Sequence, residues 1–137
     1  MASAVARRTA VGELGRVLIV DDNQPLQDSL AMVLRTFGYD VDIASDGVEA
    51  LDRIASSSYD AVLCDLLMPH MSGDELYTLC CEKHTEMARR FIFMTGSACT
   101  GPMSDFLRRT TQPYLPKPCR VNEICSAVAA MVALAHA

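Results

Sequence analysis

The chain has 137 residues, is 50% hydrophobic and 21% charged, and carries a formal net charge of −5. This length fits one domain with a hydrophobic core, and the composition excludes an intrinsically disordered chain. The acidic balance without a basic run argues against a protein that coats nucleic-acid phosphates, and no apolar stretch reaches the roughly 18 residues of a membrane span.

The first 14 residues are interpreted as an N-terminal extension or the remnant of a linker, and residues 15–137 as one domain. Residues 1–14 are too polar and too interrupted to be a secretory signal. The six cysteines show neither the C-x-x-C spacing nor the histidine cluster of a zinc site. We therefore expect reduced thiols packed as small hydrophobic groups in a cytoplasmic protein.

Strand and helix patterns alternate in the first part of the domain. Residues 16–20 form an apolar run typical of a buried strand, and residues 24–37 repeat apolar side chains at helical spacing. Gly38 is a typical helix end, and residues 39–44 alternate as a half-buried strand does. This part therefore predicts a strand, a helix and a second strand.

The middle of the chain continues the alternation. A helix is expected to begin at Asp46, with Glu49 in the position that completes a capping box, and residues 60–64 read as a third strand. The segment 65–76 contains proline and glycine and predicts a loop. A helix capped by Ser72 follows and is expected to end near Lys83.

The last part of the chain predicts two more strands and two more helices. Residues 90–94 are a fourth strand, followed by a glycine-rich loop and a short helix that ends near Arg109. Residues 113–115 are a brief fifth strand. The final helix places apolar residues on one face between Val121 and Ala135.

Five β-α units predict an α/β fold with a parallel sheet and helices on both faces. Apolar strands support this because parallel strands are buried on both sides. The expected topology is a flavodoxin-like, doubly wound, five-stranded sheet with strand order 2-1-3-4-5. Ligands of such sheets bind beyond the carboxyl ends of the strands.

Polar residues follow the predicted strands at that edge. They are Asp21, Asp22, Asp65, Thr95 and Lys117. Three carboxylates in a small space favour a divalent cation with oxygen ligands, such as Mg²⁺; neutralisation by Lys117 alone is the alternative explanation. A metal and an ammonium together suit a phosphoryl group, and Asp65, at the central strand, is best placed to accept it.

Four motifs in order make the chain resemble the receiver domain of two-component response regulators. They are "VLIVDDN" (17–23), "DLLMPHMSG" (65–73), "FMTGS" (93–97) and "YLPKP" (114–118). The resemblance extends over about 15–135, nearly the whole chain. It implies that the domain of residues 15–137 is a receiver, and that a histidine kinase or a histidine phosphotransfer domain is its partner.

The resemblance also implies the roles of the site residues. Asp65 is the expected phosphoacceptor. Asp22 resembles the direct Mg²⁺ ligand, Asp21 the residue that holds the metal through water, and the backbone carbonyl of Leu67 a further ligand. Lys117 resembles the lysine that pairs with the phosphoryl oxygens.

Two further residues resemble the family's switch pair. Thr95 is the expected hydroxyl that moves to the phosphoryl group, and Tyr114 the aromatic ring that then turns inward. The surface formed by residues 95–115 would shift for a downstream partner to read, and a homodimer through this surface is expected. Pro118 resembles the family's proline after a cis peptide bond.

Leu67 departs from the polar residue that could position a water molecule beside the phosphoacceptor, so we expect slow intrinsic dephosphorylation. No output domain follows residue 135, so we expect a regulator that acts alone or a domain of a longer protein. Similarity of two segments to receivers at the C-terminal end of hybrid sensor histidine kinases favours the second reading.

Other functions remain open from the sequence. A Mg²⁺-dependent phosphohydrolase with an aspartyl phosphate usually has a D-x-D motif, whereas Leu66 and Leu67 follow Asp65 here. A flavin-binding module would need a phosphate-binding loop where Asp21 and Asp22 stand. A docking domain that never takes phosphate is the third alternative, although all five site residues are present.

Overall fold

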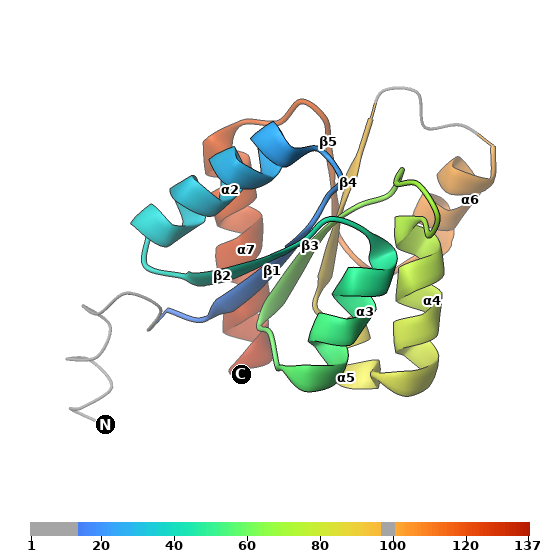
Figure 1. The fold of residues 1–137 in the computed structure, drawn as a ribbon, viewed down its shortest axis with the longest axis horizontal. Helices are drawn as coiled ribbons and strands as arrows, with labels where there is room; N and C mark the ends of the chain where they lie inside the picture. Colours follow the sequence, from blue (N-terminus) through green and yellow to red (C-terminus); the bar gives the residue numbers. More distant parts are fainter. Residues whose placement is uncertain (1–13, 97–100) are drawn as a thin grey trace.

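A five-stranded parallel sheet lies at the centre of the fold, with the strand order β2-β1-β3-β4-β5 (Figure 1). The computed structural model describes residues 14–96 and 101–137. The strands are β1 (Arg16–Val20), β2 (Asp40–Ala44), β3 (Ala61–Asp65), β4 (Phe91–Thr95) and β5 (Tyr114–Pro116). The predicted fold class and strand order are confirmed.

The helices cover both faces of the sheet. They are α2 (Gln24–Thr36), α3 (Gly47–Ser56), α4 (Gly73–Lys83), α5 (Thr85–Ala88), α6 (Pro102–Arg109) and α7 (Val121–Ala135). Figure 1 shows α2 and α7 together on one side of the sheet, and α3, α4 and α5 on the other. The expectation of an N-terminal extension over 1–14 lies, apart from Leu14, outside the described residues.

Alternate side chains of the strands enter two separate cores. Val17 and Ile19 of β1 pack with α2 and α7, whereas Leu18 and Val20 pack with the helices of the opposite face. All four side chains are fully buried. This two-sided burial explains why β1 is an apolar run rather than an alternating pattern.

Two local details differ from the sequence prediction. The short helix α5 was not predicted; its four residues are too few for a periodic pattern, and it is fixed by tertiary contacts, including the backbone N–H of Tyr59 donating to the sulfur of Met87 at 3.5 Å. Strand β5 extends to Pro116, which an edge strand tolerates.

Helix caps position the turns at the site edge. The side chain of Asp46 accepts from the backbone N–H of Glu49, as expected, but the Glu49 carboxylate accepts from the N–H of Ser45, one residue earlier than a capping box requires. The Ser72 N–H donates to the Glu75 carboxylate, which confirms that cap.

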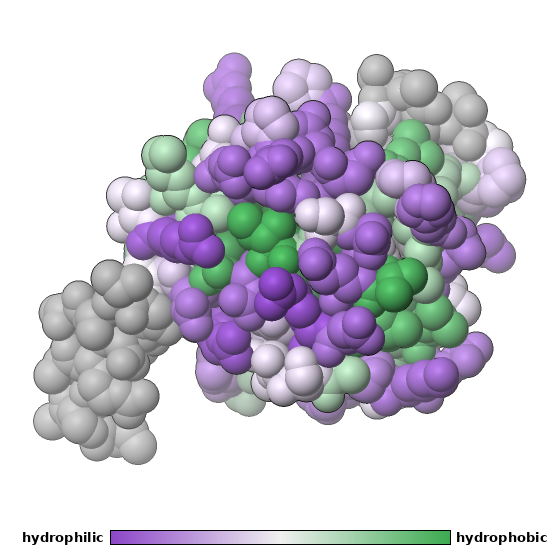
Figure 2. All heavy atoms as spheres, viewed as in Figure 1, coloured by the Kyte–Doolittle hydropathy of each residue, from purple (hydrophilic) through white to green (hydrophobic). Residues whose placement is uncertain are grey.

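The face shown in Figure 2 is mostly hydrophilic, with small separate hydrophobic patches. Within the described ranges, none of the helices combines the length and the apolar character needed to cross a bilayer.

Candidate functional site

The carboxyl ends of β1 and β3 bring three acidic side chains together. Asp21 and Asp22 follow β1, and Asp65 is the last residue of β3. One carboxylate oxygen from each of the three residues lies within 4.8 Å of the others. Asp21 and Asp65 are buried, whereas Asp22 is exposed. The predicted cluster of carboxylates is therefore present.

Lys117, which follows β5, joins two of these carboxylates. Its Nζ atom lies 3.1 Å from Asp21 Oδ2 and 3.0 Å from Asp65 Oδ2. The main chain fixes this approach, because the N–H of Lys117 donates to the carbonyl oxygen of Thr95 at 2.6 Å, so the lysine continues the pairing of β5 with β4. One ammonium thus faces a site with three carboxylates.

The pKa values of Asp65 and Lys117 are both shifted by burial and by the neighbouring charges. Burial raises the pKa of Asp65, and the charge of Asp21 adds to this, while the hydrogen bond from Lys117 opposes it. Burial alone would lower the pKa of Lys117, but its hydrogen bonds to Asp65 and Asp21 outweigh burial and raise it. Both shifts indicate an environment that favours added positive charge.

The donor set fits Mg²⁺. Carboxylate oxygens are the ligands that this hard cation prefers, and it is usually held by one or two carboxylates together with waters and phosphate oxygens. The clustered oxygens supply the ligands, and three carboxylates facing one ammonium leave negative charge uncompensated. Asp21, Asp22 and Asp65 are the residues that would hold the ion.

The backbone behind Asp65 is packed closely. The N–H of Gly73 donates to the carbonyl oxygen of Leu66 at 2.9 Å, so the start of α4 lies against the end of β3. A Cβ atom on Gly73 would stand 2.4 Å from the carbonyl oxygen of Asp65. The sequence marked this glycine only as a loop residue; its contact with the site was not predicted.

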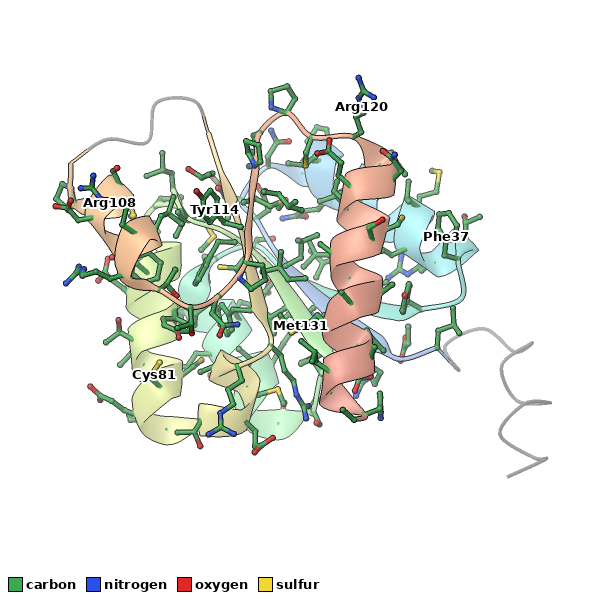
Figure 3. The ribbon with its side chains drawn as sticks, turned by 180° about the vertical axis from the view of Figure 1, so that it is seen from behind. Phe37, Cys81, Arg108, Tyr114, Arg120 and Met131 are labelled. Carbon is green, nitrogen blue, oxygen red and sulfur yellow. The ribbon has the colours of Figure 1, made fainter. Side chains whose placement is uncertain are left out.

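The two predicted switch residues differ in exposure. Thr95 is buried, and its hydroxyl donates to the carbonyl oxygen of Gly96 at 3.3 Å. Tyr114 is 50% exposed and lies on β5 between α6 and α7 (Figure 3). The structure thus places Thr95 beside the site and the Tyr114 ring outside the core. The peptide bond before Pro118 is cis, as expected.

Leu67 lies beside the phosphoacceptor candidate. Its backbone N–H donates to Asp65 Oδ1 at 3.4 Å, and the residue is 51% exposed. A half-exposed apolar residue therefore stands two positions after Asp65, with its backbone in contact with the Asp65 carboxylate. The use of the Leu67 carbonyl as a metal ligand stays a prediction.

A polar side chain near the site escaped the sequence analysis. Gln27 is buried, and its amide nitrogen donates to the main-chain carbonyl oxygen of Asp21. The sequence did offer one indication: Gln27 precedes Leu30 by three residues and Leu34 by seven, so it lies on the apolar face of α2. A polar residue on such a stripe requires a buried partner.

An apolar cavity of about 430 Å³ adjoins Lys117. Its lining residues come from α2, the end of β4, the segment between β5 and α7, and the first turn of α7, and include Leu26, Leu30, Cys119 and Ile124.

Comparison with known proteins gives a consistent result. Residues 17–129 match the family model of the response regulator receiver domain. The transcriptional regulatory protein CutR of Streptomyces coelicolor is 36% identical over 118 residues, which are 85% of this chain and 52% of CutR. The response regulator MprA of a Mycobacterium species is 32% identical over 117 residues, 85% of this chain and 50% of MprA.

Solved structures show the same fold. A CheY-like receiver domain protein from Methanospirillum hungatei superimposes with a TM-score of 0.79 and 29% identity, over 88% of this chain and 95% of that one. The chain spans about half the length of the curated relatives that it matches. These likenesses do not favour the phosphohydrolase and flavin-binding alternatives.

Proposed function

Because the chain belongs to the receiver domain family of two-component response regulators, we propose that Asp65 accepts a phosphoryl group from a phosphorylated histidine. The observation that carries this proposal is the meeting of three carboxylates and one ammonium at a single sheet edge. Within it, Asp21 and Asp22 would help Asp65 to hold Mg²⁺, with Asp22 as the direct ligand and Asp21 acting through water.

In the transfer step, a carboxylate oxygen of Asp65 attacks phosphorus. The new O–P bond forms as the P–N bond to the donor imidazole breaks, and the imidazole nitrogen keeps the electron pair and later takes a proton. Lys117 then pairs with an oxygen of the phosphoryl group. Bound Mg²⁺ supplies positive charge that offsets the negative charge on the phosphoryl oxygens.

The attacking carboxylate has to be ionised. Its raised pKa means that the site binds a proton at Asp65 more readily than an isolated aspartate does. Mg²⁺ and Lys117 oppose this by stabilising the anion. We therefore propose that the metal has two effects, on the nucleophile and on the transferred group.

We also propose that phosphorylation changes the surface formed by residues 95–115, of which residues 97–100 lie outside the described part of the chain. Thr95 would turn its hydroxyl from Gly96 to the phosphoryl group. The space it leaves would admit the ring of Tyr114, which now lies outside the core. A homodimer through this surface is one proposed readout, measured as a change in mass in solution.

The partners are proposed from the same chemistry. The phosphoryl donor is a histidine kinase or a histidine phosphotransfer domain, acting in the cytoplasm on a receiver domain of residues 15–137. The relatives named above include a transcriptional regulator, and the part of their length that this chain does not match leaves room for an output region. A hybrid histidine kinase is the alternative setting.

Treatment of the chain with acetyl phosphate and Mg²⁺ tests the central proposal. The wild-type chain is expected to gain the mass of one phosphoryl group, and Asp65→Asn is expected to gain none. Asp28→Asn, an exposed change on α2, is the matched control and should be phosphorylated normally. Phosphate on the Asp65→Asn chain, or none on the wild type, would overturn the assignment.

A further inference from the structure

Gln27 is a buried polar residue that the proposed chemistry does not use. The buried polar and charged residues of the described ranges are Asp21, Gln27, Asp65 and Thr95. Three of them belong to the site, whereas Gln27 lies on α2 and is 5% exposed. Because a buried amide needs hydrogen-bond partners, its contacts identify what it holds in place.

The Gln27 amide joins the ends of two neighbouring strands. Its nitrogen donates to the carbonyl oxygen of Asp21 and to Ser45 Oγ, the latter at 3.1 Å. Strands β1 and β2 are paired up to Val20 and Ala44, so Asp21 and Ser45 are the next residues on each. The side chain of Gln27 therefore bridges the two strands just beyond the last pair.

With this bridge, every polar group of Asp21 has a hydrogen-bond partner. The N–H of Asp21 donates to the carbonyl oxygen of Ala44 at 3.1 Å, and its carboxylate accepts from the N–H of Asn23 at 2.9 Å and from Lys117 at 3.1 Å. The remaining polar group of Asp21 is its carbonyl oxygen, which Gln27 holds.

The carbonyl of Asp21 belongs to the peptide plane that leads to Asp22. A hydrogen bond to this oxygen restrains rotation of that plane, and so restrains the direction in which Asp22 leaves the strand end. Asp22 is exposed and gains little restraint from packing. The amide of Gln27 is thus placed to orient the carboxylate that is proposed to bind the metal directly.

We propose that Gln27 is a positioning residue for the Mg²⁺ site, acting through the Asp21–Asp22 peptide. This inference rests on the proposed function, because it takes Asp21 and Asp22 as metal-binding residues. Groups that orient metal ligands typically contribute 10- to 100-fold to metal affinity. Gln27 lies on α2, so its side chain adds a second contact between this helix and Asp21, beside the N–H of the N-cap residue Asn23.

The variant Gln27→Met tests the proposal because methionine keeps the length of the side chain and removes its donor. We expect its Kd for Mg²⁺, measured by calorimetry without any phosphoryl donor, to rise by about 10-fold or more. Gln24→Met is the matched control, an exposed glutamine in the first turn of the same helix, and should keep the wild-type Kd.

A merely structural role gives a different result. If Gln27 only stabilised the fold, Gln27→Met would lower the melting temperature in chelator while leaving the Kd for Mg²⁺ unchanged, and this would overturn the proposal. In acetyl phosphate reactions, the expected signature is a higher half-saturating Mg²⁺ concentration with a maximal rate close to wild type.

A measurement on the wild-type chain covers the case in which the variant does not fold. In a Mg²⁺ titration followed by NMR, the side-chain amide signals of Gln27 are expected to shift together with the backbone N–H of Asp22. Those of Gln24 should not move, and a motionless Gln27 signal counts against the proposal. Wild-type chain that binds Mg²⁺ but takes no phosphate refutes only the phosphoacceptor function, whereas no Mg²⁺ binding refutes both.

Discussion

The Nζ atom of Lys117 lies 3.0 Å from Oδ2 of Asp65, although Lys117 follows β5, Asp65 ends β3, and β4 separates these two strands in the sheet. The ammonium is therefore placed to pair with an oxygen of a phosphoryl group bound to Asp65. Phosphorylation would replace a carboxylate partner of Lys117 by a phosphoryl partner. The pair is thus part of the proposed chemistry, and the same contact bears on the stability of the fold.

Replacing Asp65 by asparagine is expected to stabilise the fold in the absence of Mg²⁺. Burial raises the pKa of Asp65, which means that the folded state disfavours its negative charge. The neutral amide should therefore increase the free energy of unfolding, on the order of 1 kcal/mol, and raise Tm by a few degrees. Thermal unfolding in chelator measures this.

The pH dependence gives a check with a defined sign. A raised pKa in the folded state means that this group favours folding below its ordinary value of 3.8, and that this benefit is lost as the pH rises through the folded-state pKa. The advantage of Asp65→Asn over wild type should therefore be largest at neutral pH and shrink on acidification. An advantage that grows in acid contradicts the assignment.

Loss of the lysine has the opposite effect on stability. Lys117→Met leaves Asp21 and Asp65 without their cation, and we expect a loss of about 1–3 kcal/mol, less than for a fully buried pair because the Lys117 side chain is 26% exposed. Phosphorylation by acetyl phosphate should fall by about 100-fold. Lys83→Met, at the exposed end of α4, is the control.

Combining Asp65→Asn with Lys117→Met measures the interaction free energy of this pair apart from the effect of each residue alone. Once Asp65 is asparagine, Lys117→Met should cost less stability, with a coupling of about 0.5–3 kcal/mol between the two positions. Purely additive effects would show that the 3.0 Å contact contributes nothing to the folded state.

The strands and the acidic cluster followed from the sequence because each depends on short-range pattern and on the rule that parallel strands end at one edge. Val17 to Val20 predict a buried strand by themselves. Asp65 and Lys117 were correctly predicted to lie at the carboxyl edge of the sheet. The contact of Gly73 with Asp65 was not predictable in this way, since it depends on how closely α4 approaches β3.

The bridge made by Gln27 was missed for a similar reason. A glutamine is a common exposed residue of helices, and its burial here depends on the distance between α2 and the ends of β1 and β2. The short helix α5 likewise depends on contacts from outside its own four residues. Sequence patterns predict which face of an element is buried, whereas these features depend on the exact approach of two elements.

The apolar side chain of Leu67 is expected to slow the hydrolysis of the aspartyl phosphate. Leu67 is 51% exposed beside Asp65 and offers no group that could orient a water molecule. Leu67→Asn should shorten the half-life of the phosphorylated chain by roughly tenfold or more. Loss of phosphate is followed by mass spectrometry after acetyl phosphate is removed.

Leu67→Met is the control, because it keeps an apolar side chain of similar size at this position. Its half-life should stay near that of the wild type. A wild-type half-life of only seconds, or equal half-lives for the asparagine and methionine variants, contradicts the proposed role of Leu67.

The packing at Gly73 predicts a steric effect on the site. In Gly73→Ala, the new Cβ would meet the carbonyl oxygen of Asp65 at 2.4 Å and Leu66 Cα at 2.9 Å. Both are backbone atoms, so α4 or the end of β3 has to move, at a cost of about 1–3 kcal/mol or more. Chemical denaturation measures the loss, and Mg²⁺ affinity should fall as Asp65 moves.

Gly96→Ala is the matched control for this change. Among the described residues, and apart from its chain neighbours, no atom lies within 4 Å of a Cβ built on Gly96, and neither glycine requires the left-handed backbone region. The control should change the free energy of unfolding little. Equal losses in the two variants would show that the contact with Asp65 does not determine the effect, because the chain-entropy change of a glycine-to-alanine substitution by itself favours folding.

The attachment of α6 through three partly buried side chains, Met103, Phe106 and Leu107, predicts local rather than global opening. None of the residues of α6 is fully buried, and Phe106 packs edge-to-face on Phe93 of β4 at 5.2 Å and on Tyr77 of α4 at 5.8 Å between ring centroids. Such pairs contribute about 0.5–1.5 kcal/mol each. Phe106→Ala should therefore weaken the attachment of α6 selectively.

Hydrogen exchange measures this attachment directly. The N–H of Thr110, which donates to the carbonyl oxygen of Phe106 at 2.9 Å, should exchange about tenfold faster in Phe106→Ala, whereas the amides of β3 should change much less. Phe37→Ala is the control, because Phe37 is 57% exposed at the end of α2. A uniform acceleration across the sheet would show that Phe106 supports the whole core, so that α6 does not move as a separate unit.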